Sequence, residues 1–277
     1  MKKLIALLLV LAMMACMFVG CGADPAEPAA EETAAEEPAA EEAAASDAEM
    51  IIEKGTLIVG ITDFAPMDFR DDNGEWTGFD AELARLVASE LGVECEFIEI
   101  DWDNKILELD SGAIDCVWNG MTLTDEVLNA MECSNPYVVN AQVVIMDASK
   151  IADYPDVESM LDLAIAVEAG SAGDGVAQAN GFTNVTQLAA QADALMEVAS
   201  GAADACIIDL TMAKAMTGEG TSYENLAIAA EMEREEYGIG FRKGSDMAAM
   251  VNDILAGLME DGTMQELADK YELVLVD

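Results

Sequence analysis

The chain has 277 residues, with 55 Asp and Glu against 12 Lys and Arg, and a formal net charge of −43. Such an acidic surface repels phosphate backbones, which excludes nucleic acid as a partner. The chain has no His, which excludes Ser-His-Asp and Cys-His catalysis and His-ligated zinc. Because 53% of the residues are hydrophobic, we expect most of the chain to fold, as one large domain or two modest ones.

Residues 1–20 have the pattern of a bacterial export signal of the lipoprotein type. Lys2 and Lys3 precede an uncharged run over 4–19, shorter than the about twenty apolar residues that span a bilayer. The run ends in Phe-Val-Gly-Cys, which resembles a lipobox and makes Cys21 the expected lipidation site. The pattern predicts an extracytoplasmic protein, lipid-anchored to the bacterial cell membrane. The alternative is a plain secretory signal in which this Cys occurs by chance.

An acidic linker is expected over 21–49, where Ala, Glu and Pro dominate and ten carboxylates occur without a base. Like charges repel and extend such a segment. The folded part is expected from Met50 onward. Its four cysteines, Cys95, Cys116, Cys133 and Cys206, form no CxxC pair. Free buried thiols are therefore expected, with no metal or cofactor, although an exported protein could pair two of them.

From residue 55 the hydrophobic pattern alternates between strands and helices. In the first half, strands are predicted over 56–61, 93–100 and 114–118, and helices over 79–91 and 104–109. In the second half, strands are predicted at 142–147, 164–167, 185, 205–208, 226–230 and 237–241, and helices at 173–180, 187–200, 246–260 and 264–271. This order predicts an α/β fold of two lobes, each a mostly parallel sheet flanked by helices. Ligands bind outside the carboxyl ends of strands in such sheets.

Ordered motifs over 55–273 resemble family 3 solute-binding proteins, the extracytoplasmic receptors of polar amino-acid ABC transporters. The motifs include TLIVG (56–60), FAPMDF (64–69), NGEWTGFD (73–80), SGAID (111–115), WNGMTLT (118–124), ADACIID (203–209) and YGIGFRKG (237–244). Each motif is weak alone, but their order and spacing together are specific. Hallmarks of other classes, such as GxSxG and GxxxxGK[ST], are absent from the sequence.

The resemblance implies a type II periplasmic-binding-protein fold with a two-strand hinge. Lobe 1 is expected over 50–140 plus 237–277, and lobe 2 over 141–236. The lobes are expected to close around the ligand. By the same resemblance the chain is not an enzyme; it is a monomer that delivers an amino acid or related amine to the permease of an ABC importer.

Carried over position by position, the resemblance implies a set of ligand-binding residues. Aromatic positions of the pocket are Phe64, Trp102 and Trp118, each of which could instead be buried in a lobe core. Groups for the ligand's α-amino and carboxylate ends are Asn119, Gly120, Thr122, Gly170 and Ser171, the last two at a turn before a helix. Asp209 stands where the family has the acid that pairs with the α-ammonium. Its alternative role is a helix N-cap.

One position departs from the family. Its motif reads Thr-x-Glu-Arg, and the Arg clamps the ligand carboxylate through two hydrogen bonds. This chain has Val127 there, after Thr124-Asp125-Glu126. Either Ser171 and backbone amides hold the carboxylate, or the ligand lacks one, which suits a cationic amine, or the receptor binds weakly.

Two other functions stay open from the sequence. An enzyme on the same scaffold, similar to cyclohexadienyl dehydratases, would need a buried acid with a raised pKa facing the cleft. Glu126 and Glu168 are the nearest candidates. A ligand-sensing module is the third possibility, and it would require a separate signalling partner.

Overall fold

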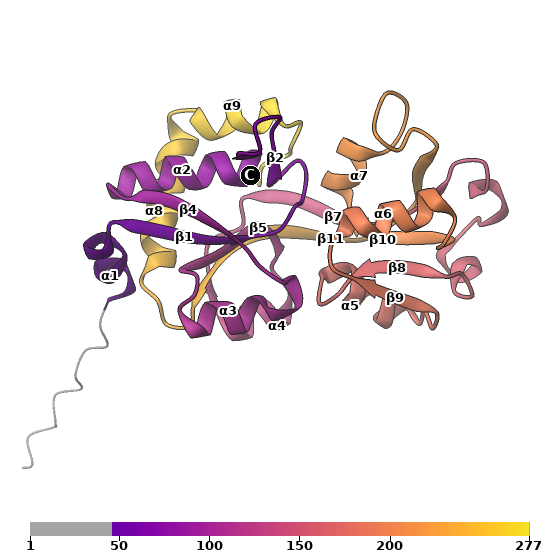
Figure 1. The fold of residues 1–277 in the computed structure, drawn as a ribbon, viewed down its shortest axis with the longest axis horizontal. Helices are drawn as coiled ribbons and strands as arrows, with labels where there is room; N and C mark the ends of the chain where they lie inside the picture. The colour runs from indigo at the N-terminus through magenta and orange to yellow at the C-terminus, as the bar shows by residue number, and fades with distance from the viewer. Residues whose placement is uncertain (1–45, 277) are drawn as a thin grey trace, which may run out of the picture. The chain divides into compact units, whose positions relative to one another are not determined.

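The computed structural model describes residues 46–276, so the expectations for the signal peptide, Cys21 and most of the linker lie outside the described residues. One mixed sheet of nine strands runs through this part of the chain in the order β4-β1-β5-β11-β7-β10-β8-β9, with β6 (Met131–Cys133) paired to β11. The two halves of the sheet form two lobes, each flanked by helices (Figure 1). No helix among the described residues is long and apolar enough to cross a bilayer.

Lobe 1 holds the parallel strands β1 (Thr56–Ile61), β4 (Glu94–Glu99) and β5 (Cys116–Thr122). On one face lie α2 (Phe79–Leu91), α8 (Met247–Glu260) and α9 (Thr263–Lys270), and on the other lie α3 (Lys105–Ser111) and α4 (Asp125–Ala130) (Figure 1). The short elements η1 (Trp102–Asn104), β2 (Phe69–Arg70) and β3 (Trp76–Thr77) complete the lobe. As predicted, α2 ends at Gly92, which takes a left-handed conformation and caps the helix.

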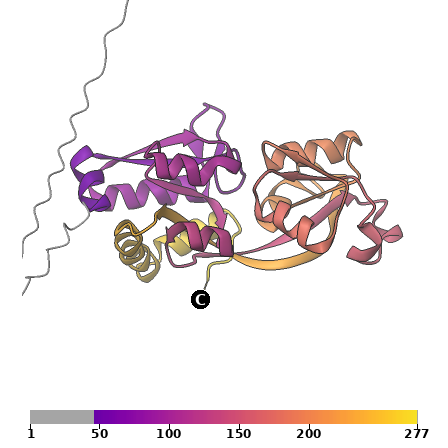
Figure 2. The same cartoon turned by 90° about the horizontal axis from the view of Figure 1, so that it is seen from below.

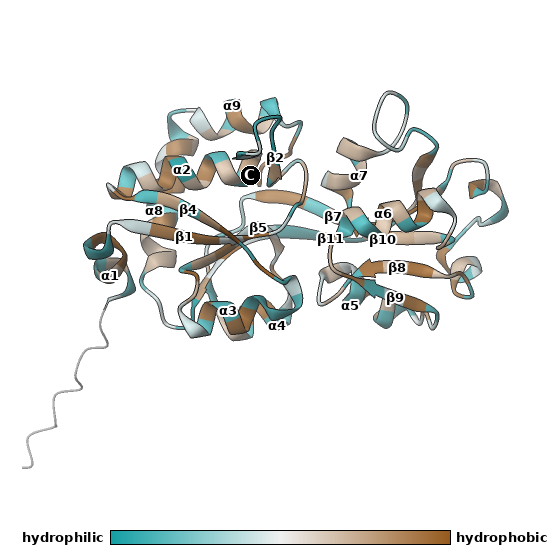
Figure 3. Ribbon diagram, in the orientation of Figure 1, coloured by the Kyte–Doolittle hydropathy of each residue, from teal (hydrophilic) through white to brown (hydrophobic). Residues whose placement is uncertain are grey.

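Lobe 2 holds the parallel strands β8 (Ile165–Glu168), β9 (Val185–Leu188) and β10 (Ala205–Asp209). They are flanked by α5 (Ala172–Asn180), α6 (Gln191–Ser200) and α7 (Leu210–Met216), with η2 (Ile151–Asp153) and η3 (Val157–Met160) in the loop before β8. The inner strands β5, β8 and β10 are buried along almost their whole length, while the edge strands β4 and β9 carry polar, exposed residues (Figure 3). The inner strands therefore have the pattern of a sheet buried on both faces.

Two long antiparallel strands, β7 (Val138–Asp147) and β11 (Leu226–Arg242), pair from Leu226 opposite Asp147 to Tyr237 opposite Val138. They pass from one lobe into the other (Figure 2). The register shifts between Glu231 and Arg234, in the stretch between the lobes. The predicted two-strand hinge therefore exists, and β11 is one continuous strand rather than the two separate strands that were expected.

The N-terminal boundary also differs from the expected one. Helix α1 (Asp47–Lys54) begins three residues before Met50, so the last residues assigned to the linker are helical. Ser46 caps this helix and donates to Asp246 at 2.5 Å, and the Ala48 amide donates to Asp246 at 3.0 Å. Acidic residues favour the first turn of a helix, which is why this end looked like more acidic linker. Helix α6 likewise begins at Gln191, not at 187 as predicted, because 185–188 form β9.

The four cysteines of the folded part are free thiols. Cys116 and Cys206 are buried, and Cys95 and Cys133 are half-buried. This agrees with the expectation of unpaired thiols. Burial raises the pKa of Cys95 to about 12 and that of Cys133 to about 11, so these thiols stay protonated and unreactive near neutral pH.

Candidate ligand-binding site

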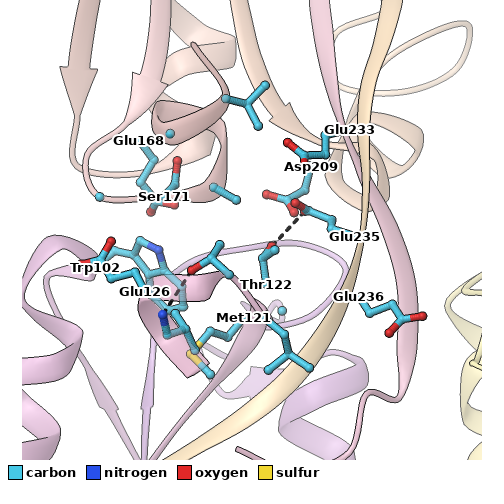
Figure 4. Close-up of a pocket in the computed structure, with 18 of the residues that line it drawn as sticks. Trp102, Met121, Thr122, Glu126, Glu168, Ser171, Asp209, Glu233, Glu235 and Glu236 are labelled. Carbon is cyan, nitrogen blue, oxygen red and sulfur yellow. Dashed lines mark hydrogen bonds between the residues drawn. The ribbon is translucent and has the colours of Figure 1, made fainter. Parts of the chain in front are cut away.

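A cleft of about 840 Å³ lies between the lobes, at the carboxyl ends of β5, β8 and β10 and beside β11. This is where ligands bind in open α/β sheets. Nine of the positions singled out from the sequence line it: Phe64, Trp102, Asn119, Gly120, Thr122, Val127, Gly170, Ser171 and Asp209 (Figure 4). These residues come from six separate stretches of the chain, and the fold brings them together.

Trp118 does not line the cleft, which corrects the prediction made for it. Its side chain is fully buried in the core of lobe 1 with Phe79 and Tyr137. Successive side chains of a strand point to opposite faces. Asn119, the next residue of β5, lines the cleft, so Trp118 faces the helices on the other side.

Phe64 and Trp102 form the aromatic part of the cleft. The Phe64 ring meets Tyr237 edge to face, with centroids 6.4 Å apart. Gly120 has φ +54°, and a Cβ atom there would collide with the Phe64 ring. Only glycine therefore allows Phe64 to lie against β5. Trp102 packs in an apolar cluster of lobe 1, and the Lys105 ammonium lies 4.9 Å from its ring centroid.

Two side chains predicted to bind the ligand, those of Asn119 and Thr122, form hydrogen bonds within the protein. The Asn119 side chain accepts the Thr62 amide at 2.8 Å and donates to the Thr62 hydroxyl at 2.7 Å. Thr122 donates its hydroxyl to Glu235 at 2.9 Å. Asn119 therefore fixes the loop after β1, and Thr122 joins β5 to the hinge strand.

Val127 forms part of an apolar floor. It is 3% exposed and packs with Trp102, Met121 and Met131. Its amide donates to the Thr124 hydroxyl, which caps α4. The position that would carry a carboxylate-binding Arg thus lines the cleft with methyl groups.

The N-terminus of α5 faces the cleft through Gly170 and Ser171. The Ser171 hydroxyl oxygen caps the helix by accepting the Asp174 amide at 3.2 Å. The Gly170 amide in turn donates to the Asp174 carboxylate at 3.4 Å. Asp174 is buried, so the helix already has an anion of its own at its positive end.

Asp209 ends β10 and is 3% exposed. Its carboxylate accepts hydrogen bonds from the amides of Asn140 and Gln191 and from the Tyr237 hydroxyl, the last at 2.7 Å. Burial raises the pKa of Asp209. Its side chain does not cap α7, so the alternative role of a side-chain N-cap is wrong.

Two further acids line the cleft that the sequence did not place there as ligand-binding groups. Glu235 of β11 accepts from Thr122, from Asn140 at 2.6 Å and from Gln142 at 2.8 Å. Glu168 ends β8 and is 4% exposed. Burial and the nearby Asp209 carboxylate raise the pKa of each glutamate to about 8. The sequence places Glu168 at a strand end shortly before Gly170, which could have indicated a ligand-binding role. From the sequence, Glu168 was named only as a possible acid of an enzyme.

Positive charge is scarce in the cleft. Lys105 and Arg234 are the bases among its lining residues, against seven carboxylates: Asp125, Glu126, Glu168, Asp209, Glu233, Glu235 and Glu236. The Lys105 ammonium donates across the cleft to the Gly170 carbonyl at 2.8 Å and to the Trp102 carbonyl at 3.3 Å. The Arg234 side chain is 82% exposed and pairs with Glu231. Among residues 46–276, no three Asp, Glu, Cys or His side chains are grouped to hold a metal ion.

Comparison with known proteins agrees with this geometry. Residues 57–273 match the model of the bacterial extracellular solute-binding proteins, family 3. The chain is 29% identical over 223 residues to the L-cystine-binding protein TcyJ of Escherichia coli K12, covering 79% of this chain and 83% of that protein.

Solved structures are similar as well. The ancestral amino acid-binding protein AncCDT-1, a precursor of cyclohexadienyl dehydratase, superposes with a TM-score of 0.75 and 31% identity, covering 82% of this chain and 99% of that one. An amino acid ABC transporter substrate-binding protein from Streptococcus pneumoniae, bound to L-arginine, gives a TM-score of 0.75 and 26% identity, covering 83% and 100%. With the family model matched over most of its length, the chain belongs to the family 3 bacterial extracellular solute-binding proteins.

Proposed function

We propose that the chain is the extracytoplasmic binding component of an ABC importer for an amino acid or related amine. The observation that carries the proposal is a cleft at strand ends, between lobes joined by β7 and β11, with the buried Asp209 carboxylate in its wall. Relatives are named for binding L-cystine, and one was solved with L-arginine. Closure of the lobes would present the loaded form to a permease.

The proposal extends to the parts of the chain around this cleft. Lobe 1 would comprise 50–140 and 237–277, and lobe 2 would comprise 141–236. Cys21 would carry the lipid that holds the protein at the outer face of the membrane.

A ligand screen tests the proposal. Thermal unfolding is followed with each standard amino acid and with a panel of amines and betaines, and hits are measured by isothermal titration calorimetry. A ligand at a hundredfold over its Kd stabilises the fold by about 2.7 kcal/mol. If no amino acid and no amine shifts the transition, the assignment as a receptor for this solute class is wrong.

A specific observation also supports a second candidate, a dehydratase on the same scaffold. Glu168 is buried in the cleft, and burial raises its pKa to about 8, as a general acid requires. One structural relative is a precursor of cyclohexadienyl dehydratase. The charge of the cleft argues against this reaction, because prephenate and arogenate are anionic and the lining carries seven carboxylates against two bases. Incubation of both compounds with the wild-type protein and with Glu168→Gln decides: turnover that needs Glu168 would favour the enzyme.

A further inference from the structure

We propose that the solute is a dication without a carboxylate group, such as an aliphatic diamine or a guanidino-amine, and that Glu168 binds its second positive charge. The inference rests on the proposed function and narrows it to one class of ligand.

The first observation is an unbalanced set of buried carboxylates. Glu168 and Asp209 are buried, Glu235 is half-buried, and all three line the cleft. No Lys or Arg among residues 46–276 forms an ion pair with any of them, and Lys105 is the nearest base, whose charge partly offsets the effect of burial on the pKa of Glu168 without a direct contact. Buried charges are normally paired, because taking an ion out of water without a partner is costly. A bound cation supplies the missing charge.

The three acids form two groups. Asp209 and Glu235 share the Asn140 amide, which donates to both carboxylates. Glu168 lies on the side of Ser171, where burial and the nearby Asp209 charge raise its pKa, and no hydrogen bond from Asn140 joins it to the other two (Figure 4). The Gln191 amide lies between Asp209 and Glu168, because it donates to Asp209 and is also a hydrogen-bond partner of Glu168. Two separate acidic positions suit a solute with a cation at each end.

Asp209 and Glu235 have their oxygens occupied by several donors from the protein, whereas Glu168 has the Gln191 amide beside it. Its carboxylate ends β8 and lies at the wall of the cleft (Figure 4). A second ammonium or a guanidinium is the group that would satisfy it.

The second observation concerns the ligand carboxylate, for which the cleft offers few donors apart from the Ser171 hydroxyl, whose oxygen accepts the Asp174 amide. The Val127 side chain has no hydrogen-bond donor for a carboxylate. At the N-terminus of α5, Ala172 lacks a hydroxyl, and the buried Asp174 occupies the positive end of the helix. Lys105 already donates to two carbonyl groups, and Glu126 is the largest of the acidic charges acting on it. An α-carboxylate would therefore lose hydration and gain the Ser171 hydroxyl but no positively charged partner.

Aromatic and apolar surfaces supply the rest of the recognition. Phe64, Trp102 and Val127 line the cleft together with the acids. Ring faces attract cations, and a chain of methylene groups packs well on rings and on Val methyl groups. Among residues 46–276 no group of acids is arranged to hold a metal ion, so an organic dication fits better than a bare divalent ion.

The experiment compares matched ligands by isothermal titration calorimetry of the full chain. Three pairs differ only by a carboxylate: agmatine and L-arginine, cadaverine and L-lysine, putrescine and L-ornithine. We expect at least one decarboxylated member to bind ten times tighter or more than its partner. We also expect Glu168→Gln to weaken cadaverine at least tenfold while changing n-pentylamine, which has one charge, less than threefold. Glu158→Gln, an exposed acid of lobe 2 outside the cleft, serves as the control and should change neither.

The possible results distinguish failure of the dication proposal from failure of the receptor function. If each amino acid binds more tightly than its decarboxylated partner, the dication is wrong and the receptor function stands. If no amino acid and no amine binds, the receptor function itself fails. If Glu168→Gln weakens n-pentylamine as much as cadaverine, Glu168 does not bind the second charge. Circular dichroism checks that the variant folds, and Glu168→Met replaces it if it does not.

Discussion

The Asn140 side-chain amide donates to Asp209 of β10 and to Glu235 of β11, so one neutral group joins two carboxylates from different elements. Asn140 itself lies on β7, the other hinge strand. The charge state of the cleft is thereby tied to the hinge that opens and closes it. Because the amide supplies no positive charge, burial and the Asp209 carboxylate raise the pKa of Glu235 to about 8, and the cleft without a cation should depend on pH.

The stability of the unliganded protein should fall as the pH rises from about 5 to 8. Burial raises the pKa of Glu168 and of Glu235 from 4.5 to about 8. The folded state therefore binds more protons than the unfolded state between these values, and stability is lost as pH rises through the window. The loss is at most about 1.4 kcal/mol per pH unit for each carboxyl group. Urea unfolding at constant ionic strength measures it.

A matched variant separates this effect from the repulsion of the whole acidic surface. Glu168→Gln removes one of the groups with a raised pKa, so its stability should fall less steeply over the same range. Glu158→Gln removes an exposed charge and should keep the wild-type slope. Equal slopes for all three proteins would show that Glu168 does not titrate in this window.

Asp209→Asn should lower the affinity for the best ligand at least tenfold, or about 1.4 kcal/mol. The substitution keeps the size of the side chain but removes the charge that faces the ligand. It also replaces one carboxylate oxygen by an NH2 group, and this donor would face the NH2 donor of Asn140 or Gln191. The free energy of unfolding should therefore fall by about 1–3 kcal/mol. Calorimetry at a temperature where the variant is fully folded isolates binding. Unchanged affinity there would remove Asp209 from the ligand site.

Gly120→Ala should disrupt the aromatic wall. Gly120 has a positive φ, which costs alanine about 1–2 kcal/mol, and the new methyl group would collide with Phe64. Gly181→Ala is the control, because Gly181 also has a positive φ but nothing lies within 4 Å of its added Cβ. We expect Gly120→Ala to lose about 1–3 kcal/mol more stability than the control and to weaken binding as well. Equal losses would mean that Phe64 moves away freely.

Membrane attachment should depend on Cys21, which lies outside the described residues. Its motif resembles a lipobox, and lipidation of this cysteine would anchor the protein. Cys21→Ala should release the protein from membranes or block its maturation, as seen by fractionation and by loss of the lipid mass. A variant that stays as firmly attached as the wild type would contradict the lipobox.

The sequence predicted the elements whose hydrophobic period is regular. The bounds of β1 and α2 agree with the predicted 56–61 and 79–91, because burial of one helix face and of whole strands leaves a clear pattern. The centre of β11 was missed. Between the lobes both faces of this strand are largely exposed, so charged residues replace the apolar period.

The same stretch of β11 contains Glu235, a cleft residue that was not identified from the sequence. Glu235 is half-buried between the exposed Arg234 and Glu236, and no sequence period distinguishes it from its neighbours. The cleft itself was predictable, because parallel strands end at a common edge. The sequence did not show whether Trp118 or Asn119 lines the cleft. Alternate residues of β5 point to opposite faces of the sheet, and the sequence does not say which set points to the cleft.

Val127→Arg should convert the cleft into a receptor for a carboxylate. Val127 lines the cleft but packs in an apolar cluster with Trp102 and Met121. A guanidinium there offers a planar pair of donors that matches a carboxylate, and Glu126 next to it eases the introduction of a positive charge. We expect the affinity for at least one standard α-amino acid to rise about tenfold or more, about 1.4 kcal/mol.

The same change should weaken ligands without a carboxylate, because the new cation repels an amine and competes for the acids of the cleft. Val127→Met lengthens the side chain without a charge and is therefore the control for crowding. Titration of all three proteins with L-arginine and agmatine measures both directions at once, and the ratio of the two affinities should invert only in the Arg variant. If wild type already binds a standard amino acid with submicromolar Kd and the Arg variant gains nothing, the carboxylate is held by other groups, and Val127 does not set the choice of ligand.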